Sequence, residues 1–346
     1  TAPSDVGASA ITGFVATAST GVGATGTSSP ISVTGLTIGT TATFRVWAVN
    51  PFGYSAPSGA TSSVTPSLIR AIIFGGDTAD SDRSGITNVI EVVSISTTGN
   101  ATDFGDLTQT ASGSSAAAST TRALRGGGRI SSTGNNANDG TTTVDYVTIA
   151  SNGNATDFGD MHSERRDAAG SSNKTRAIFG GGYNDYSGSP QVINVIQYFT
   201  ISTTGNFTDF GDLIGSGNSF LAACSSSVRT IFMGGYAYNG TKNNIIQYVT
   251  TADAADFGDL STSRYDLAAC SSATRGVSIG GIFDASPEIM EYVTIASTGN
   301  ATDFGDIAET KEHAGTSSST RGLSIGGANS YGNLNKIDYI TIASVG

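Results

Sequence analysis

The chain has 346 residues with 28 acidic and 17 basic side chains, so its formal net charge is −11 at pH 7. This acidic balance offers no basic surface for nucleic acid or anionic lipid, and we expect neither as a partner. Two cysteines exclude a disulfide framework, and two histidines exclude a three-histidine zinc site. No segment reaches the ~18 apolar residues of a membrane span, so we expect no membrane insertion.

The first 66 residues lie outside the repeat that fills the rest of the chain. Residues 31–58 contain a Gly-Leu turn, an alternating strand over 44–48 and a hairpin before Ala-Pro-Ser, and in these features they resemble the second half of a fibronectin type III sandwich. Ala42 departs from that family, which normally has a tyrosine there. The resemblance makes residues 11–19 the third strand and leaves nothing for the first two. We therefore expect a partial domain at 1–66 that begins in mid-sandwich.

A repeat fills residues 67–346, and the tetrapeptide Asp-Phe-Gly-Asp marks it. The five copies are residues 103–106, 157–160, 209–212, 256–259 and 303–306. Each unit holds short stretches rich in Val, Ile, Thr, Tyr and Phe between Gly, Ser and Asn, a pattern typical of strands and turns. We name them a (Ala-Ala-Cys-Ser-Ser and variants), b (an arginine to a Gly-Gly pair), c (Tyr-Val-Thr-Ile-Ala-Ser and variants) and d (ending in Asp-Phe-Gly-Asp). No helical period is visible, so the sequence predicts an all-β protein.

Two sets of residues recur in step with these stretches and are assigned to the architecture. Each stretch b begins with an arginine, and the six are Arg70, Arg122, Arg176, Arg229, Arg275 and Arg321. Each Asp-Phe-Gly-Asp copy carries one phenylalanine, and the five are Phe104, Phe158, Phe210, Phe257 and Phe304. We expect each phenylalanine to wedge between neighbouring units, and each arginine to lie over the neighbouring unit or to join a recurrent ion pair. An anion-binding ring of arginines is the alternative.

The Gly-Gly pair ending b, the tyrosine in c and the aromatic residue in d resemble a kelch repeat, with phenylalanine where kelch units usually have tryptophan. The resemblance covers roughly residues 68–346 and implies a β-propeller built from four-stranded blades of about 50 residues. The phrase Tyr-Val-Thr-Ile-Ala-Ser-Thr-Gly-Asn-Ala-Thr-Asp-Phe-Gly-Asp is also similar to repeats in virion proteins of marine tailed phages, cyanophages in particular.

Counting the stretches gives six copies each of b and c and five each of a and d, or 22 strands. A closed ring of six such blades needs one further a, before Arg70, and one further d, after Gly346. We expect six blades, with the natural chain continuing through the missing strands so that the ring closes and an exposed sheet edge disappears. A seventh blade is the alternative.

Asp-Phe-Gly-Asp contains the Asp-Phe-Gly motif that binds Mg²⁺ in protein kinases, but this chain has no kinase Gly-rich loop or catalytic-loop signature. A motif copied in every unit is usually architectural, with glycine at a positive φ and aspartates in turns. The alternative is a Ca²⁺ ion held by carboxylates such as Asp103 and Asp106. We expect no catalytic residue and no other metal site, because no unit carries a singular cluster of Glu, Asp and Tyr.

The connections between b and c vary in length and sequence, while the a–b and c–d turns keep nearly constant patterns. Alternating strand directions put the variable connections on one face of a propeller, where binding specificity is usually located. Their tyrosine, asparagine and aspartate side chains suit carbohydrate or polar protein surfaces. The candidate ligand-binding residues are Tyr183, Asn184, Asp185, Tyr186, Tyr236, Tyr238, Asn239, Asp284, Asn329 and Tyr331.

Three functions fit these observations. The first is a non-enzymatic protein of a virion or extracellular surface, such as a tail fibre, whose propeller adheres to a host glycan or receptor protein. The second is a structural virion component that docks on another tail or capsid subunit. The third is an extracellular carbohydrate-active enzyme on a propeller scaffold, against which the lack of a sialidase-type Asp-box argues. The sequence leaves oligomerisation open.

Overall fold

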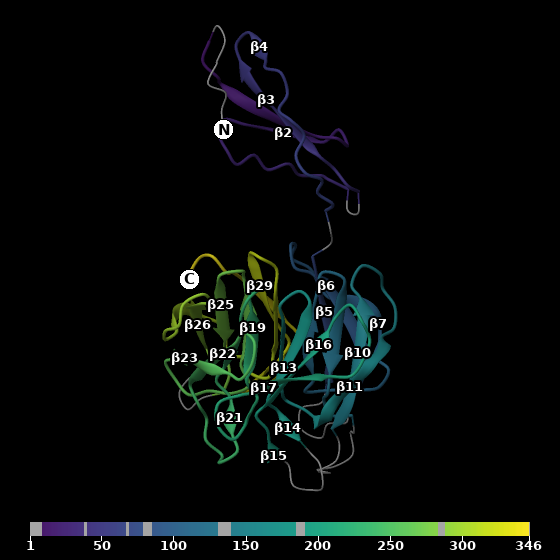
Figure 1. Ribbon diagram of the computed structural model, residues 1–346, viewed down its shortest axis with the longest axis vertical. Helices are drawn as coiled ribbons and strands as arrows, with labels where there is room; N and C mark the ends of the chain where they lie inside the picture. Colours follow the sequence, from purple (N-terminus) through teal and green to yellow (C-terminus); the bar gives the residue numbers. More distant parts are fainter. Residues whose placement is uncertain are drawn as a thin grey trace. The chain divides into compact units, whose positions relative to one another are not determined.

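The computed structural model describes residues 9–37, 40–66, 69–78, 85–130, 140–184, 191–282 and 288–345. These residues form strands, turns and irregular chain without any helix, so the predicted all-β class is confirmed. None of them belongs to a helix long and apolar enough to cross a membrane. The chain divides into two compact units, Thr1–Leu68 and Ile69–Gly346, which Figure 1 shows in colours that follow the sequence.

The first unit contains a four-stranded antiparallel sheet in the order β2-β1-β3-β4. Its strands are β1 (Gly13–Ala18), β2 (Gly23–Gly26), β3 (Phe44–Asn50) and β4 (Gly53–Tyr54). β3 covers the alternating strand expected over 44–48. Ala42 is buried, and it exchanges two backbone hydrogen bonds of 2.8 Å with Val64. The described part of this unit holds one sheet, where the fibronectin resemblance led us to expect parts of two.

The second unit contains six antiparallel sheets that follow one another along the chain. The first sheet consists of β5 (Arg70–Asp77), β6 (Ile86–Ser94) and β7 (Thr102–Asp106). The second consists of β8 (Ser115–Ala118), β9 (Arg122–Gly126), β10 (Thr141–Thr148) and β11 (Thr156–Arg165). The third consists of β12 (Ala169–Ser172), β13 (Arg176–Gly180), β16 (Val195–Thr200) and β17 (Thr208–Asp212).

The remaining three sheets repeat this plan. The fourth consists of β19 (Ala222–Ser225), β20 (Thr230–Met233), β22 (Ile245–Val249) and β23 (Ala255–Asp259). The fifth consists of β24 (Ala268–Ser271), β25 (Arg275–Ile279), β26 (Ile289–Thr294) and β27 (Thr302–Asp306). The sixth consists of β28 (Ala314–Ser317), β29 (Arg321–Ile325) and β32 (Ile337–Thr341). Stretches a to d thus become neighbouring strands, and among the described residues a is missing from the first sheet and d from the sixth.

Three short two-stranded sheets extend the connections between the main strands. They are β14 (Tyr183–Asn184) with β15 (Gln191–Val192), β18 (Asn218–Ser219) with β21 (Tyr236–Ala237), and β30 (Ala328–Asn329) with β31 (Gly332–Asn333). The sequence did not predict them, because two-residue strands are too short to show an alternating pattern.

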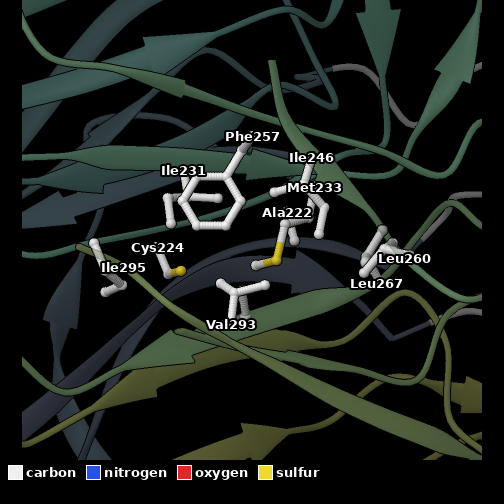
Figure 2. Packing of buried hydrophobic residues seen from close by; sticks show 11 residues of the cluster. Ala222, Cys224, Ile231, Met233, Ile246, Phe257, Leu260, Leu267, Val293 and Ile295 are labelled. Carbon is white, nitrogen blue, oxygen red and sulfur yellow. The ribbon is translucent and has the colours of Figure 1, made fainter. Parts of the chain in front are cut away.

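The phenylalanine of stretch d packs against the next sheet along the chain. Phe257 of β23 is 2% exposed and lies in one hydrophobic cluster with Val293 and Ile295 of the fifth sheet (Figure 2). Burying an aromatic ring between two sheets removes a large apolar area from water, and this favours their packing. The corresponding residues of the other sheets lie in similar clusters, and they are Phe104, Phe158, Phe210 and Phe304.

The sixth sheet packs on the first. Leu323 of β29 shares a hydrophobic cluster with Ala71 of β5, with Val93 of β6 and with Ile95, which directly follows β6. The guanidinium of Arg321 donates from Nη1 to the carbonyl oxygen of Ile95 (3.2 Å). Figure 1 shows β29 beside β5 and β6, although they come from opposite ends of the unit. Each of the six sheets therefore packs on two others.

The arginine that begins stretch b links neighbouring sheets. The guanidinium carbon of Arg229 lies 4.5 Å from the ring centroid of Tyr248 in its own sheet, and Nη1 donates to the carbonyl oxygen of Ile295 in the next (3.1 Å). The ring contact recurs at Arg122, Arg176, Arg275 and Arg321. The carbonyl contact recurs at Arg70, Arg122, Arg275 and Arg321. These partners are a ring and a carbonyl oxygen, where an ion pair was one of our expectations.

The a strands of neighbouring sheets lie side by side and are linked by serine hydroxyls. Ser271 donates from Oγ to the carbonyl oxygen of Ser225 (2.8 Å), and Ser317 donates to that of Ser271 (2.7 Å). At Gly315 the strands approach so closely that a Cβ atom would collide with the carbonyl oxygen of Ala269. This contact explains why stretch a consists almost entirely of Ala, Gly, Ser and Cys.

Candidate functional site

Four aromatic side chains meet where the b–c and d–a connections of the second unit lie together. The ring centroids of Tyr183 and Phe220 are 5.5 Å apart, and those of Phe220 and Tyr265 are 6.0 Å apart, both edge to face. The ring of Tyr236 follows, 5.2 Å from that of Tyr265. All four are partly exposed, and we call them the aromatic strip. Contacting rings that remain partly exposed form a surface against which apolar parts of a ligand can pack.

Backbone pairing between the connections positions these rings. Tyr183 and Arg166 exchange two backbone hydrogen bonds (2.8 and 3.1 Å), so the b–c and d–a connections of two neighbouring sheets meet. Tyr265 is held in the same way by Ile282 (2.7 and 3.3 Å). Tyr236 lies in β21, which pairs with β18. Backbone hydrogen bonds therefore hold the residues of the aromatic strip in place, although these residues lie in the connections between the main strands.

Two cations contact the strip. The guanidinium carbon of Arg166 lies 4.7 Å from the ring centroid of Tyr183, and its Nη1 forms an ion pair with Oδ2 of Asp167 (2.6 Å). The ammonium nitrogen of Lys242 lies 5.9 Å from the ring centroid of Tyr265. Each cation sits over the electron-rich face of a tyrosine, which holds the ring in place and adds a hydrogen-bond donor beside it.

Three carboxylates occupy equivalent positions beside the aromatic strip. The d–a connections contribute Gly113, Asp167, Phe220, Asp266 and Glu312, whose φ angles all lie between 54° and 60°. Each of the last four donates its backbone N–H to the carbonyl oxygen of the one before it, over 2.8 to 3.1 Å. This chain of hydrogen bonds runs from sheet to sheet and brings the side chains of equivalent positions together. We call Asp167, Asp266 and Glu312 the carboxylate cluster.

The carboxylate cluster changes the acidity of its central member. Burial is the main cause that raises the pKa of Asp266 from 3.8 to about 8, and the charges of Asp167 and Glu312 act in the same direction. Asp266 therefore carries a proton at neutral pH and can donate a hydrogen bond to a ligand. Burial and the charge of Asp266 also raise the pKa of the neighbouring Tyr265.

The structure brings together only part of the residues predicted from the variable connections. Tyr183 and Tyr236 belong to the aromatic strip. Tyr238 and Tyr331 lie outside it and are 61% and 94% exposed. Asp185, Tyr186 and Asp284 lie outside the described residues.

The three predicted asparagines take structural roles in their turns. Asn184 pairs with Gln191 in the two-stranded sheet of β14 and β15. Oδ1 of Asn239 accepts hydrogen bonds from the backbone N–H and the hydroxyl of Thr241 (3.2 and 2.6 Å). Oδ1 of Asn329 accepts the backbone N–H of Tyr331 (2.9 Å). The side chains of Asn239 and Asn329 shape their turns, as asparagine commonly does.

Sequence reasoning missed Phe220, Tyr265, Arg166 and the carboxylate cluster. All lie in the d–a connections, which share a face with the b–c connections but vary less in length. The signal that could have found them is a pair of positions shortly before stretch a, where equivalent units carry Ser-Gly, Arg-Asp, Ser-Phe, Tyr-Asp and Lys-Glu. Variation at one aligned position of a constant repeat indicates a residue that the fold itself does not require.

The Asp-Phe-Gly-Asp motif contacts the next sheet through backbone hydrogen bonds. Asp106 donates its backbone N–H to Oδ1 of Asn154 in the next sheet (3.1 Å). Oδ1 of Asp303, in the last copy, accepts the backbone N–H of Gly305 (3.3 Å). Within the described ranges, no group of three or more His, Cys, Asp or Glu side chains is arranged to hold a metal ion. Asp103 lies with Asp106 on β7, in the first copy of the motif.

Comparisons with known proteins add no family to this description. A scan against protein-family models finds none that matches the chain, and a search of curated proteins finds no significant match.

Proposed function

We propose that the second unit is a six-bladed β-propeller of the kelch type. Six successive antiparallel sheets, each packed on two others, support this arrangement. The repeated arginine and phenylalanine contacts between sheets are those of one structural unit copied six times. For the first unit we retain the partial fibronectin type III domain as part of the proposal, supported by β3 and the hairpin that follows it.

We propose that this propeller is a non-enzymatic recognition module that binds a glycan through the aromatic strip. The observation that carries the proposal is the run of four contacting, partly exposed rings with polar groups on its borders. Sugar rings present apolar C–H faces that stack on aromatic side chains, and hydroxyl groups that bond to charged and polar neighbours. Arg166 and Lys242 supply donors beside the rings, and the carboxylate cluster supplies acceptors and the protonated Asp266.

The virion or extracellular surface is the proposed location, with host adhesion as the role. The support is the similarity of the repeat phrase to virion proteins of tailed phages, together with an acidic net charge that suits neither nucleic acid nor anionic lipid. A face of variable connections on a constant scaffold is a common way for related proteins to recognise different ligands.

A glycan array tests the proposal. The wild-type chain is expected to bind a subset of host-surface glycans, and Tyr265→Ala is expected to lower the affinity about tenfold because it removes the ring at the middle of the strip. Tyr331→Ala is the matched control, since Tyr331 is 94% exposed and lies outside the strip. Equal binding by the two variants, with melting temperatures that show both are folded, would exclude the strip as the glycan site.

A further inference from the structure

Three arginine side chains are fully buried among the described residues of the second unit, and two of them form an ion pair with a carboxylate. Arg125 lies 3.4 Å from Asp145 in the second sheet, and Arg264 lies 2.7 Å from Glu291 in the fifth. The third, Arg165, forms no ion pair with any described carboxylate. Burying a cation without a counter-charge is costly, so a negative group from outside the chain would stabilise the protein there.

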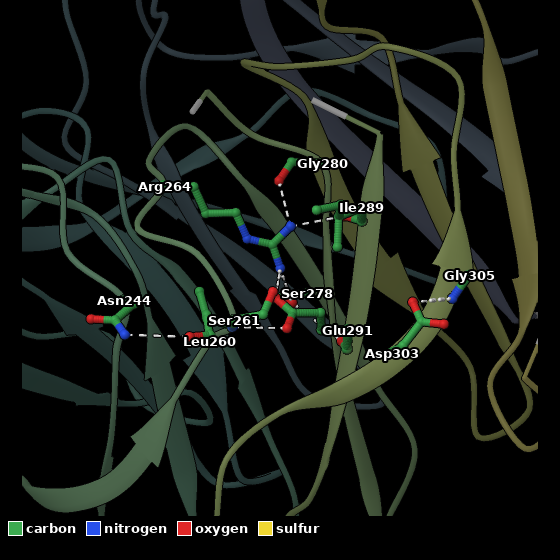
Figure 3. A network of polar contacts seen from close by, with 10 residues as sticks. All are labelled: Asn244, Leu260, Ser261, Arg264, Ser278, Gly280, Ile289, Glu291, Asp303 and Gly305. Atoms are coloured by element: carbon green, nitrogen blue, oxygen red, sulfur yellow. Dashed lines mark hydrogen bonds and ion pairs between the residues drawn. The ribbon is translucent and has the colours of Figure 1, made fainter. Parts of the chain in front are cut away.

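The fifth sheet shows how a paired arginine is held, and Figure 3 draws its contacts. Nη1 of Arg264 donates to the carbonyl oxygen of Ile289 (2.8 Å). Nη2 donates to Oγ of Ser278 and to Oε2 of Glu291 (both 2.7 Å). The other carboxylate oxygen, Oε1, accepts the backbone N–H of Ser261 (2.9 Å). Two donors thus meet the two oxygens of one carboxylate.

Arg165 occupies the equivalent position in the third sheet. The backbone carbonyl oxygens of Arg165 and Arg264 each accept the N–H of the second glycine of a Gly-Gly pair (2.6 and 2.8 Å). Nη1 of Arg165 donates to the carbonyl oxygen of Val195 (3.2 Å), which has the place of Ile289 in its own sheet. The two guanidinium groups therefore enter their sheets in the same way.

The side chain at the position of Glu291 offers the third sheet one acceptor where the fifth sheet has two. That side chain is Gln197, and its Oε1 accepts the backbone N–H of His162 (3.1 Å), the bond that Oε1 of Glu291 makes in the fifth sheet. Nε2 of Gln197 then corresponds to the carboxylate oxygen that binds Arg264. An amide nitrogen only donates, and turning the amide around would take the acceptor away from His162.

The third sheet therefore leaves buried donors without an acceptor. Nη2 of Arg165 and Nε2 of Gln197 have no hydrogen-bond partner among the described residues, and both side chains are 0% exposed. Phe179 has the place of Ser278, so the hydroxyl that accepts from Nη2 of Arg264 is also missing. Nε is unpaired in both arginines, so the two sheets differ at Nη2. Buried donors of this kind require an acceptor.

The guanidinium of Arg165 keeps its charge despite its burial. Burial lowers its pKa to about 10, so the group still carries its proton at pH 7. Burial also lowers the pKa of Arg264, but there the charge of Glu291 acts in the opposite direction. An anion would stabilise Arg165 more than a neutral acceptor, because it supplies the counter-charge together with the hydrogen bonds.

We propose that the third sheet binds a chloride ion between Nη2 of Arg165 and Nε2 of Gln197. The ion accepts a hydrogen bond from each nitrogen and does for the third sheet what the carboxylate of Glu291 does for the fifth. Because both side chains are fully buried, the site suits an ion of a single atom and excludes the larger sulfate and phosphate. This proposal does not depend on glycan binding.

Urea unfolding at different chloride concentrations tests the proposal, with gluconate replacing chloride so that the ionic strength stays constant. An ion that binds only the folded state lowers the unfolding constant about tenfold for each tenfold rise in chloride above its dissociation constant. We expect this dependence in the wild-type chain and its loss in Gln197→Glu, whose carboxylate replaces the ion. Gln247→Glu is the matched control and is expected to keep the dependence, because Asn218 stands there in place of an arginine.

A second measurement locates the ion. Crystals of the wild-type chain grown in bromide are expected to show an anomalous peak within hydrogen-bond distance of Nη2 of Arg165 and Nε2 of Gln197. Crystals of Gln197→Glu are expected to show no peak there. The proposal is overturned if chloride leaves the wild-type unfolding constant unchanged, if the wild-type chain and Gln197→Glu respond equally to chloride, or if the site holds a water molecule without an anomalous peak.

Discussion

At the scale of single residues, buried arginines depend on which partner stretch c supplies. Arg264 and the equivalent Arg165 are both fully buried. Arg264 forms an ion pair with Glu291, whereas the residue at the position of Glu291 beside Arg165 is the neutral Gln197. Burial lowers the pKa of Arg165 to about 10, and its Nε and Nη2 have no hydrogen-bond partner, nor does Nε2 of Gln197. The third sheet thus buries a cation without the carboxylate that the fifth sheet provides.

Gln197→Glu is therefore expected to stabilise the protein. The new carboxylate oxygen replaces an unpaired amide group at the position where Glu291 binds Arg264, and Nε and Nη2 of Arg165 have no partner, so we expect about 1–3 kcal/mol more stability in chemical denaturation. Gln247→Glu is the matched control, because the position equivalent to Arg165 is the neutral Asn218 there and the new charge is buried without a cation. Stabilisation by both substitutions, or by neither, would contradict this account.

The raised pKa of Asp266 makes the stability of the folded protein depend on pH. The folded state holds a proton on this residue up to about pH 8, whereas an unfolded chain releases it near pH 3.8, so the contribution of Asp266 to stability falls as the pH rises between these values. Asp266→Asn is expected to leave the melting temperature unchanged near pH 4 and to raise it by a few degrees near pH 9. The exposed Asp209→Asn is the control, and identical pH profiles for both variants would refute the raised pKa.

At the scale of elements, the d strand is the piece that joins one sheet to the next. Phe257→Ala leaves a cavity between β23 and the fifth sheet and is expected to cost about 3–5 kcal/mol of unfolding free energy. Val228→Ala, at a 67% exposed position, is expected to stay within about 0.5 kcal/mol. Similar losses for both, measured by denaturant titration, would contradict the wedge role of the phenylalanine.

The same scale shows what a repeat can and cannot predict. Strands a to d were predictable because b and c are rich in Val, Ile, Tyr and Phe between Gly, Ser and Asn turns, and because a and d recur in step with them in almost every unit. The two-stranded sheets of the connections, such as β14 with β15, were not, because strands of two residues are too short to show an alternating pattern. Tyr183 and Tyr236 were predicted as ligand residues, but their contact through Phe220 and Tyr265 could not be predicted, since it needs the relative placement of three sheets.

At the scale of the whole molecule, six copies of one unit create two different surfaces. The copied contacts fix the scaffold, while the aromatic strip and carboxylate cluster occur where the copies differ. In our account, the constant parts of the repeat hold the protein together, and the variable parts bind the ligand.

The most direct test of this account is a crystal structure of the chain soaked with a glycan that it binds on an array. We predict sugar density over Tyr183, Phe220 and Tyr265, with polar contacts to the carboxylate cluster. Sugar density elsewhere on the molecule, with the aromatic strip unoccupied, would contradict the claim that the variable connections form the recognition site.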